Sequence, residues 1–255
     1  MSLEGRVALV TGGSRGIGAA ICESLAADGA DVAVNYRRDR DAAERVVAAV
    51  EARGRRAVAV AGAVGDRESE QALVDTALAE LGHVDILVNN AGIASRGRAV
   101  IDTDPDELER VLQVHALGAH RMCRLLLGQM RELDRGDIVF ISSVATLHHR
   151  AFGAPYNMGK AAMEALAFTL AKEECPHGIR VNVVAPGLVE TEMGRRLVKA
   201  TQSVDDIRTL DDVSPFGRVC RPEDIANVVR FLVSDEAFYV SGEKVNVWAG
   251  GQDER

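Results

Sequence analysis

Aromatic side chains are scarce in this chain of 255 residues: phenylalanine, tyrosine and tryptophan together make up 4 % of it, and tryptophan occurs once. Alanine, valine, leucine and isoleucine must therefore fill most of the core. Cysteine is also rare, and the spacing of its four positions matches no metal site: Cys22, Cys123, Cys175 and Cys220. We expect reduced, mostly buried thiols and no bound metal.

A basic surface and a long apolar run are both missing. The formal net charge is −8 and the isoelectric point is near 5.3, whereas a general nucleic-acid binder carries a basic face. No apolar run approaches the roughly 20 residues that cross a bilayer, and the first residues lead into a predicted strand without the features of a signal peptide. We therefore expect a cytoplasmic protein that binds neither nucleic acid nor membranes.

Short β-branched or apolar runs alternate with longer, alanine-rich amphipathic segments. The predicted strands are Val7–Val10, Asp31–Val34, Ala57–Val60, Asp85–Val88, Asp137–Ile141, Arg180–Val184 and Lys244–Val247. The predicted helices are Gly16–Gly29, Asp41–Arg53, Arg67–Leu81, Asp106–Met130, Pro155–Glu174 and Pro222–Leu232. Strands that are apolar on both faces and alternate with helices predict a parallel sheet covered on both sides. We therefore predict a single-domain α/β protein over residues 1–255, a doubly wound Rossmann fold with a seven-stranded parallel sheet.

The connection over residues 188–218, the lid segment, is too long and too mixed in character to repeat this rhythm. We predict that it is irregular. Long connections in compact domains are commonly functional lids, and this one follows the sixth strand, where a doubly wound fold binds its ligand. We therefore expect a flexible lid over the ligand site.

A glycine-rich turn, Thr11–Gly18, joins the first strand to the first helix. Glycines in this position allow a tight turn and a close approach of the backbone to a pyrophosphate. The following helix offers free N–H groups and the positive end of its dipole to the phosphates. The turn predicts a dinucleotide site that includes Gly12, Ser14, Arg15, Gly16, Ile17 and Gly18.

The second strand ends in Asn35–Arg38, without the carboxylate that binds the ribose 2′-hydroxyl in NAD sites. Arg15 and Arg37 could instead converge on a 2′-phosphate, since guanidinium groups match phosphate geometry. The alternative is that both arginines are solvated surface residues. We predict NADP(H) as the cofactor, with Tyr36 and Arg37 in its site.

Four further segments each carry a short motif: Asn89–Gly92, Ser143, Tyr156–Lys160 and Pro186–Thr191. With the glycine turn, their order and spacing make the chain resemble the short-chain dehydrogenase/reductase family over residues 5–251. Within this family it is most similar to the β-ketoacyl-(acyl carrier protein) reductase group. The resemblance implies that a further set of residues contacts the cofactor: Val64, Asn89, Ala91, Gly92, Tyr156, Lys160, Pro186, Gly187, Val189 and Thr191.

Tyr156 and Lys160 are one helical turn apart, so their side chains share a face of the predicted helix. A nearby ammonium group favours tyrosinate, so we expect Lys160 to lower the pKa of Tyr156. The phenol can then donate a proton to the developing alkoxide during reduction, or accept one during oxidation. Ser143 would polarise the substrate carbonyl. Taken alone, the tyrosine–lysine pair could also be an ordinary pair on a helix surface.

The sequence departs from the resembling family in a few positions. Many relatives have an asparagine in the long fourth helix that completes a catalytic tetrad; here it is His115, which either sustains the proton relay or is a packing substitution with reduced turnover. Ala63 replaces an aspartate that contacts adenine. Trp248 replaces the aspartate of a common Asp-Gly-Gly, in a tail that often packs against a partner subunit. His148 and His149 lie near the expected substrate mouth, either as pocket lining or as plain loop.

We therefore hypothesise an NADP(H)-dependent oxidoreductase that reduces a ketone, of the 3-oxoacyl or polyketide type, with Ser143, Tyr156, Lys160 and His115 at its catalytic centre. The alternatives are an alcohol or sugar dehydrogenase running oxidatively, and a low-turnover protein that senses dinucleotides. The substrate is a small molecule or an acyl thioester, and docking of an acyl carrier protein stays open because Arg135 is preceded by Asp134. The resemblance also implies a homodimer or homotetramer.

Overall fold

The strand β1 (Val7–Val10) lies inside a parallel sheet, between β2 (Asp31–Tyr36) and β4 (Ile86–Asn89). The computed structural model describes residues 2–251, and within them the sheet has seven strands in the order β3-β2-β1-β4-β5-β6-β7. The other strands are β3 (Ala57–Ala61), β5 (Gly136–Ile141), β6 (Ile179–Pro186) and β7 (Lys244–Val247). All neighbouring strands are parallel. The strand order reverses at β1 and β4, where a doubly wound sheet binds its ligand.

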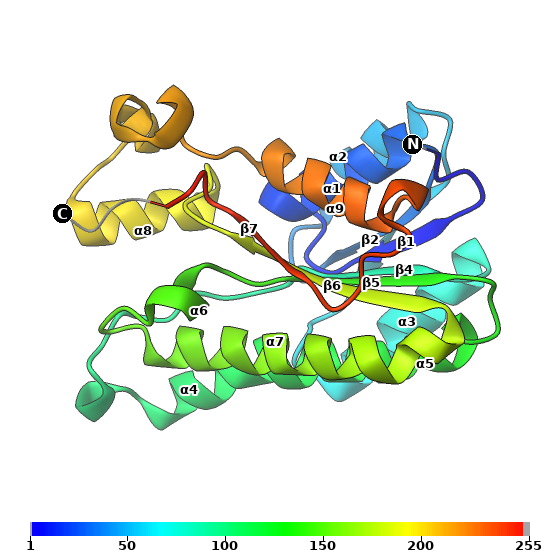
Figure 1. Cartoon of the computed structure of the whole chain (residues 1–255), viewed down its shortest axis with the longest axis horizontal. Helices are drawn as coiled ribbons and strands as arrows, with labels where there is room; N and C mark the ends of the chain where they lie inside the picture. The colour runs from blue at the N-terminus through cyan, green and yellow to red at the C-terminus, as the bar shows by residue number, and fades with distance from the viewer. Residues whose placement is uncertain (1, 252–255) are drawn as a thin grey trace.

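Helices cover both faces of the sheet (Figure 1). One face carries α1 (Gly16–Ala27), α2 (Arg40–Glu51) and α9 (Pro222–Val233); the other carries α3 (Arg67–Leu81), α4 (Pro105–Leu112), α5 (Ala119–Met130) and α7 (Ala154–Glu174). Alternate strand residues enter separate cores: Ala8 and Val10 pack on the first face, Val7 and Leu9 on the second. Because both faces are buried, the strands are apolar throughout, and the predicted doubly wound fold is confirmed.

The long fourth helix of the prediction, residues 106–130, is not one regular α-helix. It consists of α4, a π-helical segment η2 (Gln113–Gly118) and α5, with His115 inside the π-helical segment. A π-turn accommodates an extra residue and is frequent at functional sites. It turns the His115 side chain out of the register that α4 alone would give it.

We predicted that the lid segment is irregular, and this prediction is wrong. The segment contains α8 (Glu192–Gln202) and two 3₁₀ turns, η4 (Ile207–Val213) and η5 (Pro215–Gly217). Its buried residues Val198 and Ile207 form a small apolar cluster with Val219, which directly follows the segment. The Thr191 hydroxyl accepts a hydrogen bond from the Gly194 amide at 3.0 Å and so caps α8. The segment therefore packs largely on itself, at the same end of the molecule as the short helix α6 (Ala145–His148) (Figure 1).

The remaining short turns are η1 (Val100–Asp102), η3 (Cys175–His177) and η6 (Asp235–Ala237). In the part of the chain that the structure describes, no helix is both long and apolar enough to span a membrane.

Candidate active site

The turn between β1 and α1 brings two backbone segments into close contact. Gly12 and Gly16 have φ values of +61° and +55°, a region that favours glycine. A Cβ atom at Gly18 would lie 2.3 Å from the Gly12 carbonyl oxygen, so no larger residue fits there. Arg15, which precedes α1, makes no side-chain cap, so the N–H groups of the first turn stay available. This cradle fits the pyrophosphate of a dinucleotide.

Three polar residues, to which we had assigned no cofactor role, hold this turn in place. The Asn35 Oδ1 atom accepts a hydrogen bond from the Gly12 amide at 3.0 Å. Asn90 Nδ2 donates to the carbonyl oxygens of Thr11 and Gly12, at 2.9 and 3.1 Å. The Thr11 hydroxyl oxygen accepts from the amides of Asn90 and Ala91. The ends of β1, β2 and β4 are thereby joined around the turn, a role that sequence can show only once the strand order is known.

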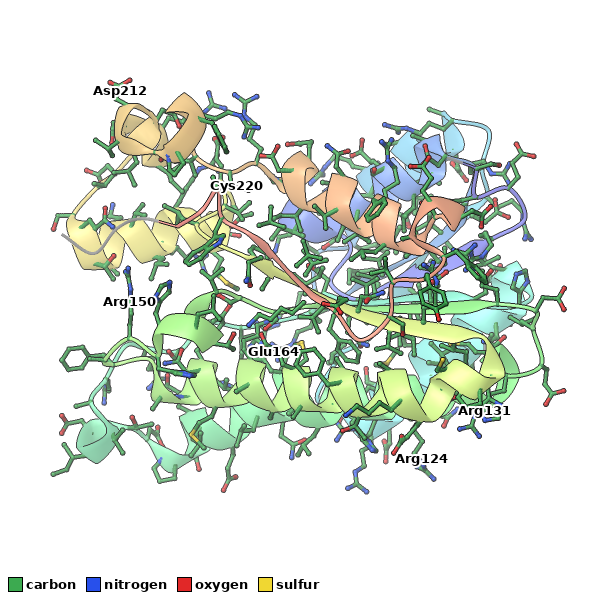
Figure 2. The ribbon with its side chains drawn as sticks, in the orientation of Figure 1. Arg124, Arg131, Arg150, Glu164, Asp212 and Cys220 are labelled. Atoms are coloured by element: carbon green, nitrogen blue, oxygen red, sulfur yellow. The ribbon has the colours of Figure 1, made fainter. Side chains whose placement is uncertain are left out.

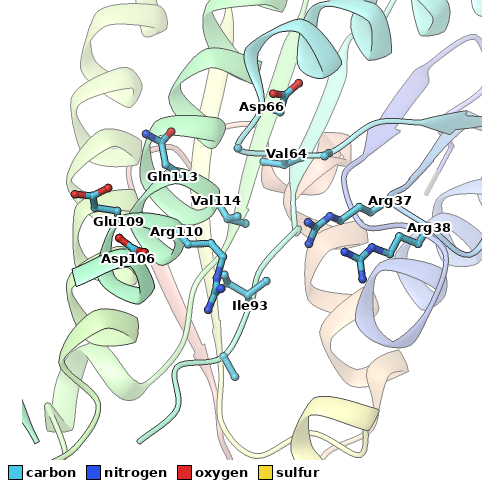
Figure 3. Close-up of a pocket in the computed structure, with 13 residues that line it drawn as sticks. Arg37, Arg38, Val64, Asp66, Ile93, Asp106, Glu109, Arg110, Gln113 and Val114 are labelled. Carbon is cyan, nitrogen blue, oxygen red and sulfur yellow. The ribbon is translucent and has the colours of Figure 1, made fainter. Parts of the chain in front are cut away.

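A cavity of about 680 Å³ opens beyond the ends of these strands, and Val64, one of the residues predicted to contact the cofactor, lines it. Arg37 and Arg38 extend into it from one wall and Arg110 from the opposite wall (Figure 3). Among residues 2–251, no side-chain hydrogen bond or ion pair joins any of these three guanidinium groups to another residue. The carboxylates of Asp66, Asp106 and Glu109 also line the cavity, but within residues 2–251 they form no ion pair with these arginines. Three guanidinium groups without an ion-pair partner can still bind an anionic group such as a 2′-phosphate, and we name the space the cationic cavity after them.

Two of the predicted cofactor residues are placed differently from our expectation. Arg15 does not join Arg37 at the cavity, because its Nη1 atom pairs with Glu192 at the start of α8, at 3.0 Å. The Asn89 side chain does not line the cavity either: it is 3 % exposed and lies 3.5 Å from the Cys123 sulfur, so of its two expected roles, a cofactor contact and support of the central strands, it has the second and braces β4 against α5. Arg38 and Arg110 line the cavity, although the sequence had indicated only Arg37.

The far end of the glycine turn meets the Pro186–Thr191 segment. A Cβ atom at Gly16 would lie 3.3 Å from the Thr191 methyl group, so the start of the lid segment covers the turn. The Gly187 amide donates to the Val247 carbonyl oxygen at 3.0 Å, which fixes the Pro186–Gly187 turn beside β7. Val189 is buried and forms a bridge to Cys220.

The helix α7 brings Tyr156 and Lys160 to the carboxyl end of β5, next to Ser143. The Ser143 hydroxyl lies close enough to the Tyr156 phenol to lower the pKa of that phenol. The Lys160 ammonium nitrogen lies 5.8 Å from the centre of the Tyr156 ring and donates to the Ile141 carbonyl oxygen at 2.7 Å. The structure therefore brings the three predicted residues together from two neighbouring elements.

The protonation of this group differs from our prediction in one respect. Burial raises the pKa of Tyr156, and the nearby Ser143 hydroxyl opposes this rise only in part. Lys160 does not lower it as we expected, because burial also lowers the pKa of Lys160 itself, to about 7, against an opposing effect of Glu164. Tyr156 is consequently a protonated phenol at neutral pH, which suits a proton donor.

His115 closes the other side of Tyr156, with the two ring centroids 5.4 Å apart. The His115 Nε2 atom lies 2.8 Å from the carbonyl oxygen of Ile93 and 3.1 Å from its amide. Burial lowers the pKa of His115 to about 3, and the charge of Lys160 acts in the same direction. The imidazole is therefore neutral at physiological pH, and it connects Tyr156 to the loop that follows β4.

Below this group lies a buried ion pair that the sequence did not reveal. Figure 2 shows Glu164 on the side of α7 that faces the sheet. Its Oε1 atom is 2.8 Å from the Lys244 ammonium nitrogen and accepts hydrogen bonds from the hydroxyls of Ser142 and Thr146. Glu164 is one helical turn beyond Lys160, so the ion pair between Glu164 and Lys244 supports the same face of α7 that carries Tyr156. Among residues 2–251, no cluster of three or more potential metal ligands is found.

The site as a whole consists of a pyrophosphate cradle, a cationic cavity and a serine–tyrosine–lysine group at one edge of a doubly wound sheet. A family model described as enoyl-(acyl carrier protein) reductase matches residues 12–251. The chain belongs to the short-chain dehydrogenase/reductase family.

Relatives within the short-chain dehydrogenase/reductase family span different substrates and both nicotinamide cofactors. Versicolorin reductase from Emericella nidulans is 38 % identical over 256 residues, which cover 97 % of this chain and 96 % of the relative. The crystal structure of angucycline C-6 ketoreductase LanV with bound NADP is 34 % identical, with a TM-score of 0.87 and 98 % of both chains covered. A second crystal structure, of 3-ketoacyl-(acyl-carrier-protein) reductase from Brucella melitensis complexed with NADH, is 32 % identical in sequence, with a TM-score of 0.87. The match covers 98 % of this chain and 99 % of that one.

Proposed function

We propose that this short-chain dehydrogenase/reductase uses NADP(H) to reduce a ketone to a secondary alcohol. The observation that carries the proposal is the convergence of Ser143, a protonated Tyr156 and Lys160, with the Lys160 nitrogen 5.8 Å from the centre of the phenol ring. A hydroxyl that can bind a carbonyl oxygen and a phenol that can protonate it are what the reduction of a ketone requires.

NADP(H), when bound, supplies the hydride. Ser143 donates a hydrogen bond to the carbonyl oxygen and favours charge development on it. Tyr156 then transfers its phenolic proton to that oxygen. The Lys160 nitrogen lies 5.8 Å from the centre of the phenol ring, and only its protonated form, which its lowered pKa of about 7 makes partial at neutral pH, would stabilise the tyrosinate that remains. His115 keeps the Tyr156 ring in place and stays neutral throughout.

The cofactor preference rests on the cationic cavity. Arg37, Arg38 and Arg110 line it without an ion-pair partner among residues 2–251, and the second strand ends without a carboxylate that would bind a ribose 2′-hydroxyl. A 2′-phosphate would supply these guanidinium groups with the ion-pair partner that they lack within residues 2–251. The relative LanV, crystallised with NADP, is consistent with this choice.

The carbonyl substrate is of the polyketide or 3-oxoacyl type; versicolorin reductase, the angucycline ketoreductase LanV and the 3-ketoacyl-(acyl-carrier-protein) reductase support this choice, while an L-rhamnose dehydrogenase and a hydroxysteroid dehydrogenase are also among the relatives. The structure gives little support to delivery by an acidic carrier protein through Arg135. This arginine is 22 % exposed, and its guanidinium nitrogens contact Asp137, Asp235 and the Val233 and Ser234 carbonyl oxygens. A side chain held in this way has little charge left for a partner.

The test is the oxidation of NADPH and of NADH by the purified protein, over a panel of cyclic ketones, quinones and 3-oxoacyl thioesters. We expect NADPH-dependent reduction of at least one class, and a loss of about 10²- to 10⁴-fold in Tyr156→Phe, the range for a missing proton donor. The phenylalanine variant should still bind NADPH, which titration of the nucleotide's fluorescence measures. If both proteins bind NADPH and neither reduces any ketone, the chain is a dinucleotide-binding protein without this activity.

A further inference from the structure

The chain's single tryptophan, Trp248, stands directly behind the Pro186–Gly187 turn. It follows β7, whose last residue, Val247, is the parallel neighbour of Pro186. A Cβ atom at Gly187 would lie 3.0 Å from the Trp248 Cβ atom. The proposed hydride-transfer site thus has an indole beside it, in a position that the proposed mechanism does not use.

The indole also contacts the segment that carries Ser143. Its ring lies 5.3 Å from the ring of His148, at an angle of 47° between the planes. His148 ends α6, which begins two residues after Ser143. On its outer edge the indole is enclosed by Gly251, where a Cβ atom would lie 2.7 Å from Cζ3. Trp248 nevertheless stays partly exposed in the single chain, so the two rings form a wall that is not completely covered.

The backbone is strained immediately after each of these two aromatic residues. His149 has a φ value of +46° and Ala249 one of +54°, although neither is glycine. Such conformations are uncommon for residues with a side chain and cost free energy. They redirect the chain right after His148 and right after Trp248, which holds the two rings against each other.

We infer that Trp248 and His148 form one wall of the substrate site and select a ketone that is part of a flat, aromatic ring system. This inference rests on the proposed ketone reduction at Ser143 and Tyr156. A carbonyl bound by Ser143 places the body of the substrate between the α6 segment and the Pro186–Gly187 turn, the two segments that the wall connects. A planar ring can stack on the indole, whereas a flexible acyl chain gains only contact area.

The test compares two ketones of equal size that differ in one ring, 2-tetralone with its aromatic ring and trans-2-decalone with a saturated one. We expect the wild-type protein to prefer 2-tetralone in kcat/KM. Trp248→Ala should lower this preference by roughly 3- to 10-fold, the factor that an aromatic pair contributes, and Trp248→Phe should keep most of it. Phe238→Ala removes an aromatic residue that is 72 % exposed, and it should leave the preference unchanged.

Because the protein has one tryptophan, its fluorescence reports on this wall without any turnover. With NADP⁺ present, 2-tetralone should change the emission of Trp248, and trans-2-decalone should change it much less. If the emission responds but neither ketone is reduced, the proposed function fails while the aromatic wall stands. If both ketones are reduced and Trp248→Ala lowers both rates by the same factor, the wall is overturned while the function stands. An equal effect of Phe238→Ala would overturn it as well.

Discussion

The imidazole of His115 lies edge-on to the phenol ring of Tyr156, with the two planes at 79°. Two glycines make room for it: a Cβ atom at Gly92 would lie 2.9 Å from His115 Cε1, and one at Gly159 would lie 3.1 Å from His115 Cβ. The Nδ1 atom is buried and has no hydrogen-bond partner within residues 2–251. His115 therefore acts on Tyr156 through packing and through its bond to Ile93, as a positioning residue.

This geometry predicts that His115 contributes by its shape and not by a proton of its own. His115→Ala should lower kcat by about 10-fold or more, because the cavity that it leaves frees the Tyr156 ring. Since burial lowers the pKa of His115 to about 3, the histidine is neutral over the whole assay range. The pH dependence of kcat between pH 5 and 8 should thus be the same in His115→Asn as in the wild type. Loss of an ionisation near pH 6 in that variant would show that His115 does exchange protons.

The buried lysine makes stability depend on pH in a defined direction. Burial lowers the pKa of Lys160 to about 7 from its ordinary value of 10.5, so between these values the unfolded chain binds more protons than the folded one. Stability from this group is therefore lowest below pH 7 and rises as the pH rises toward 10.5. From pH 7 to 9, the wild type should gain stability over Lys160→Met, by at most about 1.4 kcal/mol per pH unit.

Urea unfolding followed by circular dichroism at pH 7, 8 and 9 measures this difference. Lys172→Met is the matched control, since Lys172 is an exposed lysine of the same helix. The free energy of unfolding of Lys172→Met should change with pH in the same way as that of the wild type. A constant difference between the wild type and Lys160→Met over this range would mean that Lys160 keeps its ordinary pKa in the folded protein.

A third prediction concerns the ion pair beneath the site. The side chains of Glu164 and Lys244 are 11 % and 15 % exposed, so either one left alone is a mostly buried charge. Glu164→Gln should therefore destabilise the protein by about 3 kcal/mol. Lys244→Met should cost less, because Ser142 and Thr146 still donate to the carboxylate. The double variant should lose clearly less than the sum of the two, and additive losses in urea unfolding would refute the coupling.

The sheet was predictable because its strands are apolar on both faces, a pattern that few other environments produce. Tyr156 and Lys160 were predictable as a pair because a separation of four residues fixes one helix face, whatever surrounds it. Their ionisation was not, because it depends on burial. The effect that lowers the pKa of Lys160 also raises that of Tyr156, and neither follows from the spacing.

Other features were missed because they depend on partners distant in the sequence. Arg15 turns away from the cavity because Glu192, on α8, supplies a carboxylate within 3.0 Å. Arg110 reaches the cavity because α4 packs across from the end of β2, which no local pattern indicates. The helix α8 was hidden by its many charges, although Thr191 is a good N-cap residue at its start.

The last prediction separates the two cofactors at the cationic cavity. Arg37→Ala should raise the KM for NADPH by about 10- to 100-fold, the value of a hydrogen bond to a charged group, and should change the KM for NADH far less, because NADH lacks the 2′-phosphate. Arg40→Ala is the control: this nearby arginine is exposed and already hydrogen-bonded to Glu44, at 3.2 Å. Its removal should leave both constants unchanged. Equal effects of Arg37→Ala on NADPH and NADH would assign the guanidinium to a part that both cofactors share, and would remove the physical basis for the preference for NADP(H).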